Sequence, residues 1–273
     1  MERAHYHLTE RSKRILQLAA KYNQDVIEHH HLFIAACREA AGVCGELHVY
    51  LHKQLGNQFL NFMKEQDEKD KGRASQSNLS LVLEKADEKR QYYRQTLINE
   101  GHIIQSILET DSSLNDWLTE EMKEAIIDIA CVPRDMVVHL GKYQSKSHIG
   151  YKNSIRRAVH ADLPELKQFI KSEFGDRWIK RINHLPASGQ LSVFLAEYNG
   201  EIIGFACFDV EKKGMFGPMG TSNHIRLHSV GKELLHRSLM DMADRGYAYA
   251  VIEQAGPIEF YEKACGAKLI PWF

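Results

Sequence analysis

The sequence predicts two domains: an all-α first domain over residues 1–145, and an α/β second domain over residues 150–273 with a mixed, mostly antiparallel sheet. Three observations support this division. Apolar residues recur at helical spacing through the first half. Pro133 is the single proline of that half, and the other five of the six prolines follow it. After the polar segment 141–153, which is the expected seam, short β-rich runs alternate with helical ones.

The composition excludes several classes of protein. The chain has 273 residues and a formal net charge of -1, so no broad cationic surface is expected for nucleic acid or an anionic membrane. No apolar run reaches the roughly 18 residues of a spanning helix, and the first residues do not resemble a signal peptide. The five cysteines are widely spaced and contain no CxxC, which indicates neither a disulfide framework nor a metal site. We expect a cytoplasmic protein without a metal.

The first half is predicted to be a series of amphipathic helices. Thr9 is a candidate N-cap for a helix that carries Ile15 and Leu16 on its apolar face. A polar break at residues 69–78 divides the half. Further helical stretches are expected at residues 31–36, 47–63, 79–97, 102–108 and 120–140.

Two histidines indicate a faint internal duplication. His31, in HLF, and His102, in HII, each open a short apolar helix that follows a charged amphipathic one. His31 also ends a run of three histidines that begins at His29. Adjacent helical residues point about 100° apart, so the run does not converge on one metal ion, and we expect a structural or surface role for it.

Three stretches of the helical half resemble the amino-terminal domain of Clp-type AAA+ unfoldases. They are LTERSKRILQLA (8–19), HHHLFIAACREAAGV (29–43) and LHKQLGN (51–57), within a resemblance that covers about residues 5–140. That family domain is a pseudo-twofold pair of four-helix repeats, and the resemblance implies a module that recognises a protein or peptide. The chain has no Walker motif, which excludes an unfoldase motor.

The second half opens with a predicted strand and helix. SIRRAV (154–159) alternates as a strand does. Asp162 is a candidate N-cap, and Pro164 lies just inside the helix that should end at Phe174.

A hairpin follows, at residues 191–198 and 201–210. Its two β-rich runs are joined by Asn199 and Gly200, a strong signal for a two-residue turn. The remaining elements are expected to be a strand at 214–221, a helix at 230–245 closed by Gly246, a strand at 247–253, a helix at 257–264 and a strand at 267–270.

This order of elements, together with four short stretches, resembles the GNAT acyltransferase superfamily over residues 153–273. The stretches are IRRAVHADLPEL (155–166), AEYNGEIIGFA (196–206), GPMGTSNHIRLHSVGKELL (217–235) and FYEKACGA (260–267). The resemblance implies an N-acetyltransferase that moves an acetyl group from acetyl-CoA to an amine by direct attack in a ternary complex. The acceptor, a small molecule or a protein, is not readable, and the residues that select it are expected within 174–190.

The family's CoA loop corresponds to Arg226–Gly231, RLHSVG, which keeps the first and last positions of the signature. Ser229 replaces a glycine. A loop of this kind aims backbone N–H groups at a pyrophosphate, and Arg226 and Lys232 supply positive charge. The resemblance implies as CoA-binding residues Met219, Gly220, Thr221, Arg226, Leu227, His228, Ser229, Val230, Gly231 and Lys232.

Catalysis in the family needs a proton donor and a base. Tyr261 matches the tyrosine that can protonate the departing thiolate, and a phenol with a reference pKa near 10 is a suitable donor. Glu253 is the first candidate for the base, followed by Glu211 and by His224. Cys265 is expected to be a small packing residue.

A second hypothesis also fits the sequence. The serine at position 229 and the lack of an unambiguous base are compatible with a catalytically degenerate GNAT-fold binding or regulatory module, whose helical half mediates a protein interaction.

Overall fold

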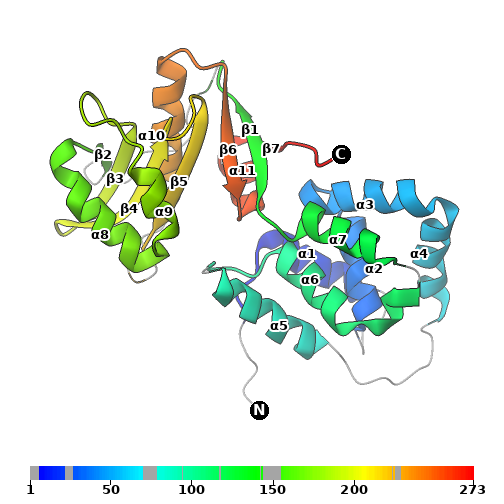
Figure 1. The fold of residues 1–273 in the computed structure, drawn as a ribbon. Coiled ribbons are helices and arrows are strands. Elements are labelled where there is room, and N and C mark those ends of the chain that lie inside the picture. Colours follow the sequence, from blue (N-terminus) through cyan, green and yellow to red (C-terminus); the bar gives the residue numbers. More distant parts are fainter. Residues whose placement is uncertain are drawn as a thin grey trace. The chain divides into compact units, whose positions relative to one another are not determined.

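The computed structural model describes residues 6–21, 27–69, 79–93, 95–116, 118–141, 143, 155–222, 224 and 229–273. The chain divides into two compact units (Figure 1). The first holds Met1–Pro133, Gly256–Glu259 and Pro271–Phe273, and the second holds Arg134–Ala255 and Phe260–Ile270. The expected seam at 141–153 and the polar break at 69–78 lie almost wholly outside the described residues. No described helix is long and apolar enough to cross a membrane.

The first unit is helical, as predicted. Its core contains fully buried side chains such as Phe33, Leu47 and Ile103. Thr9 caps the first helix, since its hydroxyl accepts the N–H of Ser12 at 3.1 Å. The helices are α1 (Glu10–Ala19), α2 (His29–Glu39), α3 (Gly42–Leu55), α4 (Asn57–Lys69), α5 (Leu79–Tyr92), α6 (Glu100–Thr110) and α7 (Glu120–Ala130), with a 3-10 helix η1 (Ser112–Asp116).

Three of the predicted helices are too long. The stretch 79–97 is helical only to Tyr92, where α5 ends. The stretch 47–63 is divided at Gly56, whose φ of +52° is incompatible with a continuous α-helix, so α3 ends before it and α4 starts after it. The stretch 120–140 is helical only to Ala130. Arg134–His139 is instead a strand, β1, in which Arg134, Met136 and Val138 are buried and the residues that alternate with them are more exposed. Side chains of β1 alternate with a period of two residues, which does not fit the helical period predicted for this stretch.

The two histidines of the predicted duplication, His31 and His102, each accept a backbone hydrogen bond at the start of a helix. At the start of α2, His31 Nδ1 accepts the N–H of Glu28 at 3.0 Å. At the start of α6, His102 Nδ1 accepts the N–H of Asn99 at 3.2 Å. Each histidine therefore satisfies a backbone donor that a helix start leaves without an intrahelical partner. This finding gives His31 the structural role expected for it.

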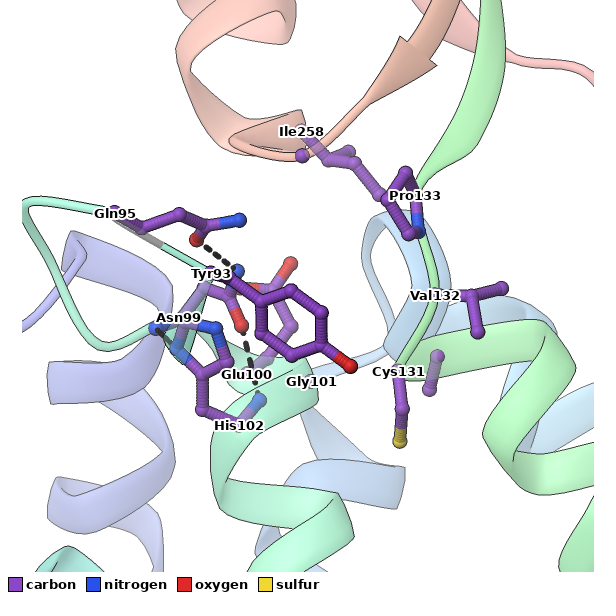
Figure 2. Close-up of a pocket in the computed structure, with 12 residues that line it drawn as sticks. Tyr93, Gln95, Asn99, Glu100, Gly101, His102, Cys131, Val132, Pro133 and Ile258 are labelled. Carbon is purple, nitrogen blue, oxygen red and sulfur yellow. Dashed lines mark hydrogen bonds between the residues drawn. The ribbon is translucent and has the colours of Figure 1, made fainter. Parts of the chain in front are cut away.

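His102 also lines a small pocket of the first unit (Figure 2). The ring of Tyr93 stacks on it with centroids 6.0 Å apart, and the side chain of Asn99 accepts the N–H of His102. The imidazole is only 3% exposed. Burial is the main cause that lowers the pKa of His102 to about 4, and the nearby positive charges of Arg90 and Lys89 add to it.

We expect the first unit to lose stability as the pH falls from about 6.5 to about 4. Over this range the unfolded chain binds a proton at His102 that the folded chain does not, because the folded pKa lies below the unfolded one. The loss is about 3 kcal/mol when complete. His102→Gln keeps an acceptor for the Asn99 N–H but cannot titrate, so its unfolding, followed by circular dichroism, should depend less on pH. An equally steep pH dependence in this variant would contradict the assignment.

The second unit is an α/β domain around one sheet. Its strand order is β2-β3-β4-β5-β6-β1-β7, and the pairs are antiparallel except for β5 with β6. The elements after β1 are β2 (Ile155–Arg157), a 3-10 helix η2 (His160–Asp162), α8 (Leu163–Phe174), α9 (Arg177–Ile182), β3 (Val193–Tyr198), β4 (Glu201–Phe208), β5 (Met215–Thr221), α10 (Val230–Asp244), β6 (Tyr249–Ala255), α11 (Ile258–Cys265) and β7 (Lys268–Leu269).

Helices cover both faces of this sheet (Figure 1). Phe205 of β4 packs under α8 and α9, where the ring of Trp178 lies 6.0 Å from its own. Its strand neighbour Gly204 faces α10 instead, since a Cβ there would meet Leu234 at 3.1 Å. Consecutive residues of a strand point to opposite faces, so α8 and α9 cover one face and α10 covers the other.

Local signals in the second half have mixed outcomes. The hairpin between β3 and β4 is confirmed, because Asn199 and Gly200 both have positive φ, at +52° and +85°. Asp162 is the N-cap residue of α8 and the helix ends at Phe174, as predicted, but the Asp162 side chain makes no cap hydrogen bond. Its carboxylate accepts the N–H of Val159 at 2.7 Å and pairs with Arg156, so it stabilises the turn before the helix.

Candidate active site

The parallel strands β5 and β6 are hydrogen-bonded to each other only at the start of β5. Their paired residues are Met215 with Val251 and Phe216 with Ile252. Beyond Phe216, β5 continues beside β4 as far as Thr221, whereas β6 continues beside β1. The strands therefore part after the Phe216–Ile252 pair, in the middle of the sheet.

Backbone donors of β5 face this parting. The N–H of Ser222, just after the strand, donates to the carbonyl of Ile203 next to β4. Because N–H groups of a strand point alternately to its two sides, those of Met219 and Thr221 point away from β4 and toward the parted side. Two of the three β5 residues predicted to bind the CoA arm thus aim N–H groups where an extended ligand could add to the strand.

The side chain of Phe174 leaves no room for a Cβ at position 220. A Cβ at this position would lie 2.4 Å from the ring of Phe174, so the ring packs directly on the strand backbone. Trp178 stacks on Phe174 with ring centroids 4.6 Å apart. A side chain at position 220 would therefore clash with Phe174, on the face covered by α8 and α9.

The start of α10 lies beside the end of β5. A Cβ on Gly231 would meet Thr221 Cγ2 at 3.7 Å and Phe260 at 4.0 Å, which are ordinary contacts. Packing alone does not require glycine at this position. Val230 is buried and Lys232 is exposed. The predicted loop residues Arg226, Leu227 and His228 lie outside the described residues.

Ser229 precedes α10 in a left-handed conformation, with φ of +76°. Its carbonyl accepts the N–H of Glu233 at 2.9 Å, so its backbone opens the helix while its side chain makes no cap hydrogen bond. A residue with a Cβ is strained in this region, and glycine is not.

We expect Ser229→Gly to raise the free energy of unfolding of the second unit by about 0.5–1 kcal/mol, because the variant removes that strain. Chemical denaturation measures the change. Ser229→Ala is the matched control, since it removes the hydroxyl but keeps the Cβ. Equal stability of the glycine and alanine variants would contradict the explanation.

Tyr261 lies on α11 against the strand that parts. Its ring contacts that of Phe216, the last β5 residue paired with β6, at 6.5 Å between centroids. The side chain is 6% exposed. Burial, with a smaller contribution from Cys265, raises the pKa of Tyr261 above its ordinary value, so the phenol is protonated at neutral pH.

The two candidate carboxylate bases share one partner, Arg181, which lies in the segment 174–190 expected to select the acceptor but for which the sequence predicted no catalytic role. Glu253 directly follows Ile252 on β6, and both its oxygens accept from Arg181 of α9, at 2.9 and 3.1 Å. Glu211, in the turn before β5, lies 3.2 Å from Nε of the same guanidinium. No local sequence signal indicates this pairing, because Arg181 is 72 residues from Glu253.

The remaining candidates are less well placed for catalysis. His224 is exposed just after β5, with its N–H on the hydroxyl of Ser222. Cys265 donates to the carbonyl of Tyr261 at 3.1 Å, and burial raises the pKa of its thiol to about 11, so it is not a ready nucleophile. Among the residues that the structure describes, no three potential metal ligands cluster.

A mixed sheet with a parting parallel pair, flanked by a helix start and a buried phenol, defines an acyltransferase-like domain. Residues 156–267 match the model of the family described as "Acetyltransferase (GNAT) family". The second unit thus carries a GNAT acetyltransferase domain, which confirms the resemblance predicted for this half. The resemblance of the helical half to Clp amino-terminal domains is not shown.

Solved structures similar to the chain include several acetyltransferases. One is described as a GCN5-related glucosamine N-acetyltransferase region of a fungal multi-domain β-N-acetylglucosaminidase, with 15% identity, a TM-score of 0.43 and coverage of 59% of this chain and 22% of that one. A GCN5-related N-acetyltransferase from Sphaerobacter thermophilus has 17% identity, a TM-score of 0.41 and coverage of 56% and 54%. A putative GNAT acetyltransferase from Novosphingobium aromaticivorans has 13% identity, a TM-score of 0.37 and coverage of 51% and 60%.

The chain therefore spans less than two thirds of the length of these three structures. No curated protein sequence matches the chain significantly.

Proposed function

We propose that the protein is an acetyl-CoA-dependent N-acetyltransferase that acts on a primary amine of a small molecule or a protein. The observation that carries the proposal is the parting of β5 from β6 after Phe216, with the N–H groups of Met219 and Thr221 turned toward the parted side. An acetyl thioester would supply an activated acyl group there. These N–H groups would hold the extended arm of the co-substrate and polarise its carbonyl.

The start of α10 would hold the pyrophosphate. Backbone N–H groups of a helix start attract anions, and Gly231 places no side chain on this first turn of α10. Lys232 is exposed beside it and would add positive charge, with Ser229, Val230 and the loop residues Arg226, Leu227 and His228 completing the cradle.

The proton transfers follow from the positions of Tyr261 and Glu253. The amine nitrogen forms a bond to the acyl carbon, the carbon–sulfur bond breaks, and the electron pair leaves on sulfur. Glu253 takes the proton that the amine loses, and Tyr261 gives its proton to the thiolate. Glu211 is the alternative base, since it contacts the guanidinium of Arg181, which also binds Glu253.

Isothermal titration with acetyl-CoA and CoA, followed by thiol release assays with spermidine, tyramine, lysine and a lysine-containing peptide, tests the proposal. We expect micromolar to millimolar binding and release of CoA with at least one amine. No heat and no thermal shift with either nucleotide would refute it. The alternative of a GNAT-fold module without turnover is not favoured, because the buried phenol and the carboxylates are retained, and it predicts CoA binding with no thiol release.

For the first unit we propose recognition of a protein or peptide, on the basis of its sequence resemblance to Clp amino-terminal domains. Fluorescence anisotropy with a labelled unfolded polypeptide such as reduced casein tests this role. Absence of binding up to millimolar polypeptide would contradict it.

A further inference from the structure

Strand β6 is irregular at the point where it leaves β5. Between the pairs Met136–Ile252 and Arg134–Ala255, β6 contributes two residues, Glu253 and Gln254, against one residue of β1, Asp135. Gln254 has a φ of +49°, and its N–H donates to Asp135 Oδ1 at 2.8 Å. This is a β-bulge, a feature that redirects side chains and is common beside active sites.

The bulge allows two adjacent side chains to reach the same helix. Arg181 of α9 binds Glu253, and Arg177 of α9 donates to the side-chain oxygen of Gln254 at 2.7 Å. In a regular strand two successive residues would point to opposite faces of the sheet. The local irregularity therefore turns Glu253 and Gln254 together toward α9.

Arg181 holds Glu253 in one orientation. Its two terminal nitrogens each donate to a different carboxylate oxygen, the bidentate geometry that fixes both the distance and the plane of the carboxylate. The Arg181 and Glu253 side chains are 20% and 23% exposed, so the pair is shielded from solvent without being fully buried. Nε of Arg181 faces Glu211, which anchors the guanidinium from the turn before β5.

We infer that Arg181 is a positioning residue of the acetyltransferase site, which fixes the carboxylate of Glu253 at the parting of β5 and β6 while Glu211 fixes Arg181. The inference rests on the proposed function, in which Glu253 takes the proton of the amine. Each carboxylate oxygen has two lone pairs, and Arg181 uses one on each. A lone pair therefore stays available for an amine that approaches from the parted side.

Arg181→Ala and Arg181→Lys test the inference, with Arg177→Ala as the matched control. Arg177 lies on the same helix and binds the next residue of the same bulge, so its loss weakens the attachment of α9 without releasing Glu253. The measurement is steady-state CoA release with the panel amine that the unaltered chain acetylates fastest, together with titration of every variant with acetyl-CoA.

We expect Arg181→Ala to lower kcat by about 10- to 100-fold, because a displaced base is a poor base, while the KM for acetyl-CoA changes by less than about 3-fold. Arg181→Lys should recover part of the rate, since an ammonium keeps the charge but not the two-point geometry. Arg177→Ala should keep kcat within about 3-fold of the unaltered chain.

Two outcomes overturn the inference while the proposed function survives. The first is a kcat of Arg181→Ala that is not lowered. An unchanged kcat would mean that the guanidinium does not position Glu253, and a higher kcat would mean that it hinders Glu253 as a base. The second is an equal loss in Arg177→Ala and Arg181→Ala, which would mean that both residues only attach the helix. Failure of the unaltered chain to bind acetyl-CoA would instead refute the proposed function, and with it the inference.

Discussion

Replacing Tyr261 with phenylalanine is expected to lower kcat by about 100-fold or more and to leave acetyl-CoA binding unchanged. The substitution removes only the hydroxyl, and the ring keeps its contacts with Phe216 and Phe260. The fold should therefore persist, while the thiolate loses its proton donor. Thiol release and acetyl-CoA titration on the same sample separate these two effects.

The pH dependence of the Tyr261 step has a definite sign. A proton donor works only while protonated, and burial raises the pKa of this phenol above its ordinary value of 10.0. The rate of the unaltered chain should therefore not fall through ionisation of Tyr261 as the pH approaches 10. A loss of activity in this range that Tyr261→Phe abolishes would contradict the assignment.

Tyr247→Phe is the control for this variant. Tyr247 belongs to the same unit, and its hydroxyl donates to Asp209 at 2.8 Å, so the variant also loses one phenolic hydrogen bond. We expect its kcat to match that of the unaltered chain. Comparable losses in both variants would point to a general effect on folding and would remove Tyr261 from the mechanism.

The second large effect is expected from Gly231→Glu, which should weaken acetyl-CoA binding by about 100-fold or more. A carboxylate at the start of α10 would occupy the space proposed for the pyrophosphate and would repel its charge. The same carboxylate interacts favourably with the helix dipole, so the stability of the folded chain should be unchanged or slightly higher. Loss of binding without loss of stability is the signature of an anion site.

Gly231→Ala measures how much of this effect comes from size. Its methyl group fits against Thr221 and Phe260 without a clash, so the variant should fold normally. We expect it to bind acetyl-CoA about 3- to 10-fold more weakly, because a methyl group would keep the phosphate away from the backbone N–H groups of this turn. Unaltered acetyl-CoA binding by Gly231→Glu in isothermal titration would show that the start of α10 is not the phosphate site.

Features with local causes were predictable from the sequence. The hairpin at Asn199 and Gly200 depends on two residues that tolerate positive φ, and the cap at Thr9 depends on a hydroxyl one turn from its donor. The order of strands and helices after residue 155 follows from apolar residues that recur every 2 residues in strands and every 3.6 residues in helices. These signals lie within a few residues of the structure that they specify.

The features that were missed depend on distant partners. Arg181 joins two carboxylates from different parts of the chain, and nothing around it in sequence distinguishes it from the other arginines. The glycine at 220 accommodates Phe174, which comes from a helix 46 residues earlier. The bulge at Gln254 arises against Asp135, a residue of the strand that was predicted as helix.

Strand β1 has a consequence for how this protein can be divided. It lies between β6 and β7 in the sheet, although it precedes the family match that begins at residue 156. A fragment cut at residue 150 would lose the partner of both strands and would expose an unpaired apolar edge that is prone to aggregate. The cooperative folding unit therefore begins no later than Arg134, and the chain that leads out of the helices is itself a structural part of the acetyltransferase sheet.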